Sequence, residues 1–111
     1  MKEEVKDLWV AALRGGKYEQ GKGHLRCGPM YCCLGVLCDL LAVPVRDHGN
    51  CYAFGDEVTT AYLPASAMDA SGIISVDGSL PGGCESLSTL NDRGTPFLDI
   101  ATIIEANWQH L

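Results

Sequence analysis

The segment Tyr31–Val43 is the most apolar stretch of this chain, and it constrains the fold more than any other feature. It reads YCCLGVLCDLLAV and is followed by Pro44, a residue that ends helices. Its length favours a buried helix, in which Gly35 costs up to about 1 kcal/mol relative to Ala unless a neighbouring segment packs closely there. Since a chain of 111 residues has room for one core, we expect this helix to be part of a single domain, residues 1–111.

Two amphipathic helices are predicted at the two ends of the chain. Near the start, apolar residues recur at helical spacing over residues 3–14, and Gly15-Gly16 ends the pattern. Near the end, Thr95 is a typical helix cap, Pro96 suits the first helical position, and residues 97–108 carry one apolar stripe. Both helices are expected to bury their apolar faces in the same core.

Shorter elements are expected between these helices. Cys51–Phe54 and Ile73–Val76 are predicted strands, because Gly and Asp flank short apolar runs. Leu63–Ala70 is predicted to contain a short helix with Pro64 at its first position, and Glu85–Leu90 one more helical turn or two. The expected fold is therefore of α+β class, with two to three helices packed on a small, mainly antiparallel sheet.

Composition bears on where the protein acts. No apolar run approaches the roughly 20 residues that span a bilayer, and the acidic start MKEEVKDLWVAAL lacks the cleavage site of a secretory signal. The predicted location is the cytoplasm, with no membrane partner. Because thiols stay reduced there, the six cysteines are expected to pack as small hydrophobic side chains rather than to form disulfides.

Charge is unevenly distributed along the chain. The formal net charge is −6, but residues 1–26 carry a balance of +2 and residues 27–111 a balance of −8. We expect any anionic ligand to bind the N-terminal quarter of the chain. Nucleic acid would be repelled by the remainder, so it is not a predicted partner.

The glycine-rich loop between Arg14 and Arg26 is the first candidate for a ligand-binding site. Residues 16–22 fit the start of the nucleotide P-loop, but Gly23 replaces the magnesium-binding Ser or Thr, and the loop follows a helix instead of a strand. An NTPase is therefore excluded. A weaker hypothesis is a phosphate and base site formed by Arg14, Lys17, Tyr18, Lys22 and Arg26. The alternative is a solvated surface loop.

The cysteines do not form a recognisable metal motif. Cys27, Cys32, Cys33 and Cys38 lack the paired C-x-x-C spacing of structural zinc sites, and His24 with Cys27 gives a single H-x-x-C pair. No metal site and no cofactor are predicted.

A cysteine nucleophile is a second hypothesis for this segment. Cys32 or Cys33 would stand at the first turn of the predicted helix, where the helix dipole lowers a thiol pKa, and His48 could serve as the base. The string around Cys33 is faintly similar to the D-C-S-G-L-V segment of papain-like cell-wall peptidases. However, no Asp precedes Cys33, and His48 follows closer in sequence than that fold requires.

Three blocks of sequence resemble a known family. They are W-x3-L-R-x-G-x-Y-x-Q-G from Trp9, Y-C-C-L-G-V-L-C-D from Tyr31 and L-N-D-x-G-x2-F-x2-I-A from Leu90. Together they resemble a family of small uncharacterised proteins carried by bacteriophages and prophages. The resemblance implies a phage origin and action inside the host cell, and it implies no catalytic residues.

Three functional hypotheses follow. The first is a phage-type accessory protein that inhibits host defence by sequestering a small anionic, nucleotide-derived signal, with a homo-oligomer sharing the ligand between copies; context alone supports this analogy. The second is an acidic inhibitor that binds a host enzyme, in which charge reversal at Asp56, Glu57 or Asp69 should matter. The third is the thiol hydrolase. Binding is favoured over catalysis.

Overall fold

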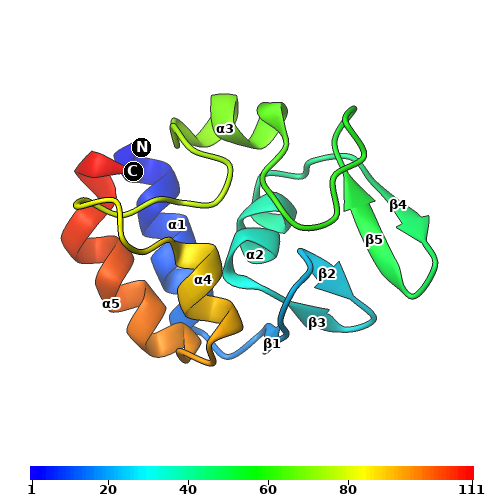
Figure 1. Cartoon of the computed structure of the whole chain (residues 1–111), viewed down its shortest axis with the longest axis horizontal. Helices are drawn as coiled ribbons and strands as arrows, with labels where there is room; N and C mark the ends of the chain where they lie inside the picture. The colour runs from blue at the N-terminus through cyan, green and yellow to red at the C-terminus, as the bar shows by residue number, and fades with distance from the viewer.

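Helix α2, Cys33–Leu40, lies at the centre of the structure and confirms the predicted buried helix (Figure 1). The computed structural model describes every residue of the chain, Met1–Leu111. Each residue from Cys33 to Cys38 is buried, and Cys32 precedes the helix as its N-cap. The helix is shorter than the apolar segment, but Val43 beyond its end is also buried.

Gly35 marks the closest approach between α2 and another part of the chain. A Cβ atom at this position would lie 1.7 Å from the carbonyl oxygen of Leu25 and 2.6 Å from its carbonyl carbon. The same oxygen accepts a hydrogen bond from the amide of Cys32 at 3.1 Å. The backbone at Leu25 therefore packs directly on α2 at its only glycine. This close contact explains why the helix has glycine at this position.

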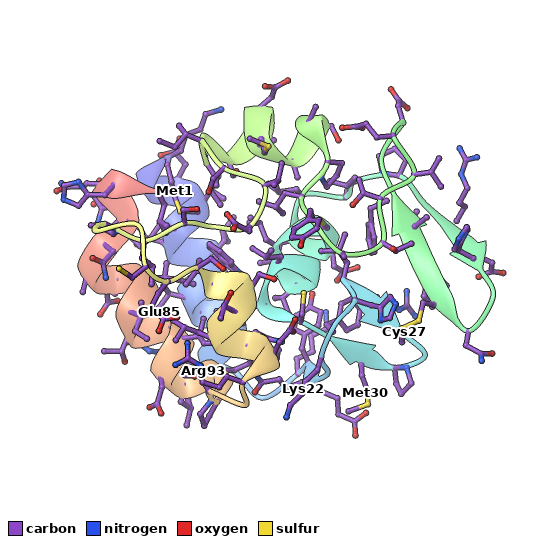
Figure 2. All side chains as sticks on the ribbon, in the orientation of Figure 1. Met1, Lys22, Cys27, Met30, Glu85 and Arg93 are labelled. Atoms are coloured by element: carbon purple, nitrogen blue, oxygen red, sulfur yellow. A yellow bond between two sulfur atoms is a disulfide. The ribbon has the colours of Figure 1, made fainter.

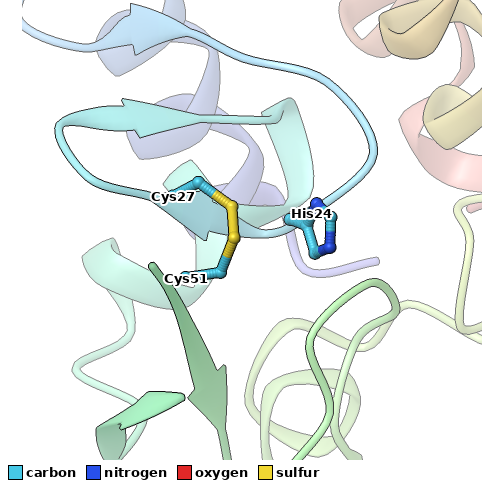
Figure 3. A group of neighbouring side chains, drawn as sticks. All are labelled: His24, Cys27 and Cys51. Atoms are coloured by element: carbon cyan, nitrogen blue, oxygen red, sulfur yellow. A yellow bond between two sulfur atoms is a disulfide. The ribbon is translucent and has the colours of Figure 1, made fainter. Parts of the chain in front are cut away.

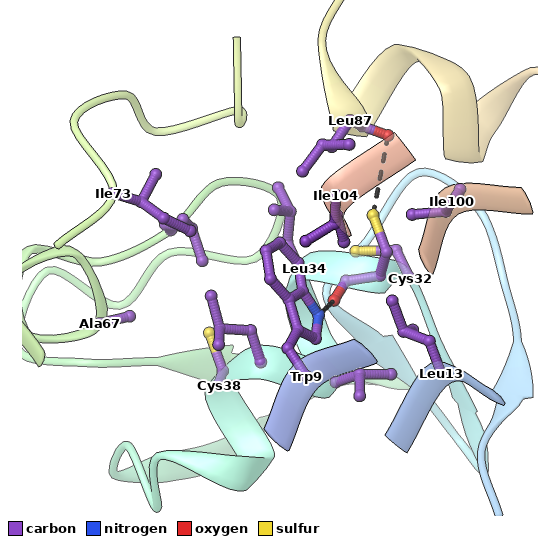
Figure 4. Packing of buried hydrophobic residues seen from close by; sticks show 14 of the residues in the cluster. Trp9, Leu13, Cys32, Leu34, Cys38, Ala67, Ile73, Leu87, Ile100 and Ile104 are labelled. Carbon is purple, nitrogen blue, oxygen red and sulfur yellow. Dashed lines mark hydrogen bonds between the residues drawn. The ribbon is translucent and has the colours of Figure 1, made fainter. Parts of the chain in front are cut away.

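The two terminal helices pack side by side, and the N-terminal one also packs against α2. Helix α1 spans Glu3–Arg14 and helix α5 spans Phe97–Asn107, followed by a 3-10 turn at Trp108–His110. Figure 1 shows the two helices, blue and orange-red, adjacent along their lengths. Trp9 of α1 is fully buried at the contact with α2, where its indole N–H donates to the carbonyl oxygen of Cys33 at 2.9 Å (Figure 4).

Two short helices complete the helical part of the fold. Helix α3, Ala65–Ser71, buries Ala67 in the core, and helix α4, Leu87–Asp92, buries Leu87 and Asn91 against α2 and α5. None of the helices is long and apolar enough to traverse a bilayer.

The sheet has five short strands in the spatial order β1-β3-β2-β5-β4. Strand β1 pairs with β3 in parallel, and the other three pairings are antiparallel. The β2–β5 pairing consists of one residue pair, Cys27 with Cys51, so it is the narrow link between the β2–β3 hairpin and the β4–β5 hairpin. The strands are β1 Glu19–Gln20, β2 Arg26–Cys27, β3 Met30–Tyr31, β4 Val45–His48 and β5 Cys51–Phe54.

The predicted architecture is wrong in its helix count. The chain is of α+β class, but it contains five α-helices instead of two to three, and the sheet is mixed, with three of its four strand pairings antiparallel. The short helices are stabilised by caps: the Ser86 hydroxyl accepts from the amide of Thr89, and the Glu57 carboxylate accepts from the amide of Ala65. Such contacts stabilise helices that are too short to form alone.

Two local predictions are also wrong. Ile73–Val76 is not a strand, because its backbone partners lie apart: the amide of Ile74 donates to Leu111, while Val76 accepts from the amide of Leu63. Thr95 does not cap α5, whose first amide, that of Phe97, donates to the side chain of Gln20.

Candidate functional site

The three sequence blocks meet at one buried polar junction, which we define as Gln20, Gly21, Cys33, Asn91 and Phe97. The Asn91 side chain has no exposed surface, and its Oδ1 accepts from the Cys33 amide at 3.1 Å and from Gln20 Nε2 at 3.0 Å. Its Nδ2 donates to the carbonyl oxygen of Gly21 at 2.8 Å. Gln20 Oε1 in turn accepts from the Phe97 amide at 3.1 Å.

This polar junction satisfies backbone groups that helix ends and loops would otherwise leave unpaired. It joins the loop after α1 to the first residues of α2 and α5 and to α4. The motif residues Gln20, Asn91 and Trp9 therefore have structural roles, and the candidate functional site has to be sought among side chains that reach the surface.

The structure brings together three of the five basic-loop candidates. Lys17 Nζ lies 5.3 Å from the ring centre of Tyr18, and the Tyr18 and Tyr31 rings meet edge to face at 5.0 Å. The Arg26 guanidinium lies 5.1 Å from the ring centre of Tyr31 and 4.1 Å from that of Tyr52. We call these five residues, Lys17, Tyr18, Arg26, Tyr31 and Tyr52, the cation–aromatic cluster.

The other two candidates lie outside this cluster. Arg14 forms an exposed ion pair with Glu105 of α5, at 3.1 Å. Lys22 points to the turn between α4 and α5, beside Gly94 (Figure 2). The five predicted residues therefore do not form one site.

Sheet register explains why the cation–aromatic cluster forms. Arg26 is the cross-strand partner of Tyr31, and the Cys27–Cys51 pair places Tyr52 on the other side of Arg26. Directly opposed residues share a face of a sheet, so the guanidinium lies between two aromatic rings. The three tyrosines also pack on the core, and the Tyr18 hydroxyl donates to Asp39 of α2 at 2.5 Å.

Burial raises the pKa of Tyr18 far above its usual value, and the hydrogen bond to Asp39 adds to this effect. Burial likewise raises the pKa of Tyr31. Both phenols therefore remain neutral hydrogen-bonding groups near neutral pH. The cluster presents partly exposed ring edges and two cations, and no pocket is present on the molecule that would enclose a ligand.

The thiols of the proposed cysteine nucleophile are enclosed in the core. Burial raises the pKa of Cys32 to about 11, and it raises the pKa of Cys33 well above its usual value. The Cys33 thiol donates to the carbonyl oxygen of Leu87 at 3.7 Å (Figure 4). The helix-dipole effect expected at this position is outweighed by burial. His48 lies in the exposed strand β4 as the partner of Cys51 and not of Cys33.

The expected burial of reduced thiols is confirmed for Cys32, Cys33 and Cys38 and is wrong for the other three cysteines, since the free thiol of Cys84 is exposed. Cys27 and Cys51 form a disulfide across the β2–β5 pairing. His24 lies beside them, and one ligand atom from each of the three residues falls within 4.8 Å of the others (Figure 3). These are the residues that could hold a metal ion. The H-x-x-C spacing of His24 and Cys27 was the only sequence signal for this cluster, because Cys51 comes from a distant hairpin.

The fold defines a small α+β domain, and residues of the three sequence blocks contribute to its core and to the polar junction. The chain belongs to a family described as a domain of unknown function, DUF8296, whose family model matches residues 1–108 and so includes all three blocks. No curated protein and no solved structure matches the chain.

Proposed function

We propose that this protein is an accessory protein of a bacteriophage or prophage that acts in the host cytoplasm by binding and inhibiting a host protein. The observation that supports this proposal best is an exposed surface around α3 in which large apolar side chains lie beside carboxylates. The phage origin rests on the resemblance of the three sequence blocks to proteins carried by bacteriophages and prophages.

Three apolar side chains form the centre of this surface. Ile74 is 80% exposed, Tyr62 52% and Val76 47%. The hydrogen bond from the Leu63 amide to the carbonyl oxygen of Val76, at 2.8 Å, brings the Tyr62 and Val76 segments side by side. Because exposed large apolar groups that adjoin one another commonly mark interaction sites, this cluster is a suitable core for a protein interface.

Exposed carboxylates lie on α3 and on the segment that precedes it. Asp69 lies on the exposed side of α3, and Asp56 and Glu57 precede the helix. The Glu57 carboxylate accepts from the Ala65 amide at 2.5 Å, and this hydrogen bond lowers its pKa, so it stays charged near neutral pH. We define the α3 surface as Asp56, Glu57, Tyr62, Asp69, Ile74 and Val76. Its chemistry complements a partner with an apolar patch bordered by Lys and Arg, and the overall charge of −6 would speed that association.

Replacing one apolar residue of this surface should abolish partner binding. We expect tagged wild-type protein to retain a host protein specifically, and Ile74→Asp to lose it because a carboxylate would be placed at the centre of a desolvated contact. Asp69→Lys should weaken retention, and the interaction should weaken as salt is raised. The measurement is affinity capture from host extract followed by calorimetry with the captured protein.

Leu98→Asp is the matched control, because Leu98 is 61% exposed on α5, outside the α3 surface. It should bind as the wild type does. Equal capture by Ile74→Asp and the wild type, or no specific partner at all, would contradict the proposal.

A second candidate function is the capture of a small anionic, nucleotide-derived signal. It is supported by the cation–aromatic cluster, in which Lys17 lies over Tyr18 and Arg26 over Tyr31. A base could stack there on exposed ring surface, and phosphates could meet two cations. An open cluster of this kind would need a second copy of the chain to enclose the ligand.

Calorimetry with a panel of cyclic nucleotides and ADP-ribose derivatives tests this second function. If it is right, Lys17→Ala should weaken binding about tenfold, because a charge-assisted hydrogen bond is lost, whereas Lys2→Ala should leave binding unchanged. If the folded protein binds none of these nucleotides, this candidate function is wrong. Lys17→Ala should not affect binding through the α3 surface, so the two functions can be separated.

A further inference from the structure

His24, Cys27 and Cys51 form a compact group of metal-ligating side chains on one face of the sheet (Figure 3). His24 is exposed, and the two cysteines are half-buried. The group lies apart from the α3 surface and uses neither the basic loop candidates nor the buried thiols. Strand pairing and backbone hydrogen bonds hold the three residues in place.

The two cysteines are held together by strand pairing. They are direct partners in the antiparallel β2–β5 pairing, and the Gly28 amide donates to the carbonyl oxygen of Asn50 at 3.2 Å. That hydrogen bond connects the residue after Cys27 with the residue before Cys51, so the two cysteines form a non-hydrogen-bonded pair, the type in which opposed residues approach most closely. Their Cα atoms are 3.9 Å apart, and their side chains share one face.

The histidine is fixed by its neighbour in sequence. Leu25 has no exposed surface, and its amide donates to the carbonyl oxygen of Thr60 at 2.7 Å. Because Leu25 is anchored in the core, His24 is directed outward beside the cysteine pair. On the other side, the turn at Gly49-Asn50 closes the β4–β5 hairpin, and Gly49 has the positive φ, 76°, that the first position of a tight type II′ turn requires.

We propose that in the reduced protein these three residues bind Zn²⁺, through the imidazole of His24 and the thiolates of Cys27 and Cys51, with a fourth position open to solvent. Two thiolates and an imidazole are a preferred zinc donor set. Zn–S and Zn–N bonds of about 2.3 and 2.0 Å place the tetrahedral sulfur and nitrogen ligand atoms about 3.5–3.8 Å apart. The ligand atoms already lie within 4.8 Å of one another, so side-chain rotation after opening of the disulfide suffices.

The chemistry of the exchange balances with a low-molecular-weight thiol as reductant. Two reductant thiols supply two electrons and two protons, the S–S bond of the protein breaks, and the reductant leaves as its own disulfide. Zinc then displaces the two thiol protons to solvent and binds the thiolates, while neutral His24 donates a ring-nitrogen lone pair. The disulfide and the zinc ion are alternative ways of joining the two hairpins at the single β2–β5 residue pair.

The test uses chelator-treated full-length protein, reduced with a phosphine under argon, and Zn²⁺ or Co²⁺ as the probe. We expect native mass spectrometry to show one zinc ion per chain. The cobalt-substituted protein should give a thiolate-to-cobalt charge-transfer band and the strong d–d absorption of tetrahedral Co²⁺. Zinc should also protect Cys27 and Cys51 from alkylation, while the exposed thiol of Cys84 reacts at every zinc concentration.

The variants separate this site from adventitious binding. Cys27→Ser and Cys51→Ser should abolish stoichiometric binding, and His24→Ala should weaken it at least about tenfold, in line with the loss of one protein ligand. Cys84→Ser and His110→Ala are the matched controls, an exposed cysteine and an exposed histidine outside the group, and should bind as the wild type does.

Three results would overturn the proposal: no zinc bound by folded, reduced wild type; binding that survives the double variant C27S/C51S; or unchanged affinity in His24→Ala. The His24→Ala result tests the proposal even if the serine variants fail to fold. His24 is an exposed side chain, so its removal should leave the circular dichroism spectrum unchanged.

Discussion

Gly35→Ala is expected to destabilise the protein by at least about 3 kcal/mol, and so to leave a large part of it unfolded at room temperature. In most helices this substitution stabilises by up to about 1 kcal/mol. Here the added Cβ would lie 1.7 Å from the carbonyl oxygen of Leu25, and that oxygen is fixed backbone, which also accepts from the Cys32 amide. This steric clash can be relieved only if α2 moves away from the loop, and that movement would separate buried side chains.

Urea denaturation followed by tryptophan fluorescence and far-UV circular dichroism measures this effect. Gly15→Ala is the matched control, because Gly15 ends α1 with a right-handed helical φ of −77°, where alanine is accommodated. Its unfolding free energy should change by less than about 1 kcal/mol. A Gly35→Ala protein as stable as the wild type would show that the contact between α2 and Leu25 is not as close as described.

Asn91→Leu is expected to cost about 3–5 kcal/mol of unfolding free energy. Leucine keeps the branched shape of asparagine but is bulkier, so overpacking adds to the loss of hydrogen bonds. The buried Cys33 amide and the partly buried Gly21 carbonyl lose this partner, while Gln20 Nε2 keeps its second acceptor, the carbonyl oxygen of Thr95. Each buried polar group left unpaired costs about 1–3 kcal/mol. The expected result is a lower denaturation midpoint with an unchanged slope.

A double-mutant cycle between Asn91→Leu and Gln20→Ala identifies the polar junction as the cause. The two side chains share a hydrogen bond and a network, so the double variant should lose at least about 0.5 kcal/mol less than the sum of the single losses. Thr89→Ala, at an exposed position of the same helix, is the control and should change stability by about 0.5 kcal/mol or less. Additive losses would show that Asn91 acts through packing alone.

The parts of the fold that could be predicted from the sequence are those determined by local periodicity. The apolar spacing of residues 3–14 and the length of the apolar segment before Pro44 determine where α1 and α2 lie within a few residues. Glycine at position 35 costs helix stability unless a neighbouring segment packs closely there, and the structure shows such a neighbour. A glycine in a buried helix signals such a contact, although nothing in the sequence could identify Leu25 as the neighbour.

The parts that could not be predicted depend on partners far away in sequence. Thr95 and Pro96 are typical of a self-contained helix start, yet Gln20, from another loop, caps α5. The two-residue strands β1, β2 and β3 have no periodicity to detect, since each exists through its pairing. Ile73–Val76 has strand-like composition, but its hydrogen bonds go to two different segments, so no strand forms.

The geometry of the candidate sites could not be predicted either, because it also depends on partners far away in sequence. Residues 14–26 are dense in positive charge along the chain, but the ion pair with Glu105 holds Arg14 on the helical side, and only sheet register could reveal that Arg26 lies between Tyr31 and Tyr52. The position of Cys33 at a helix start suggested reactivity, whereas its burial, a property of the whole core, raises its pKa instead.

The polar junction also determines when the nascent chain can complete its fold during synthesis. Gln20 and Cys33 are synthesised early, but their partners Asn91 and Phe97 come near the end of the chain. Because synthesis proceeds at about 5–20 residues per second, the first turn of α2 must wait several seconds with its amide unpaired before the native topology can close. This domain can therefore close its native topology only after Phe97 has been synthesised, and until then the Cys33 amide depends on water for the hydrogen bond that Asn91 later provides.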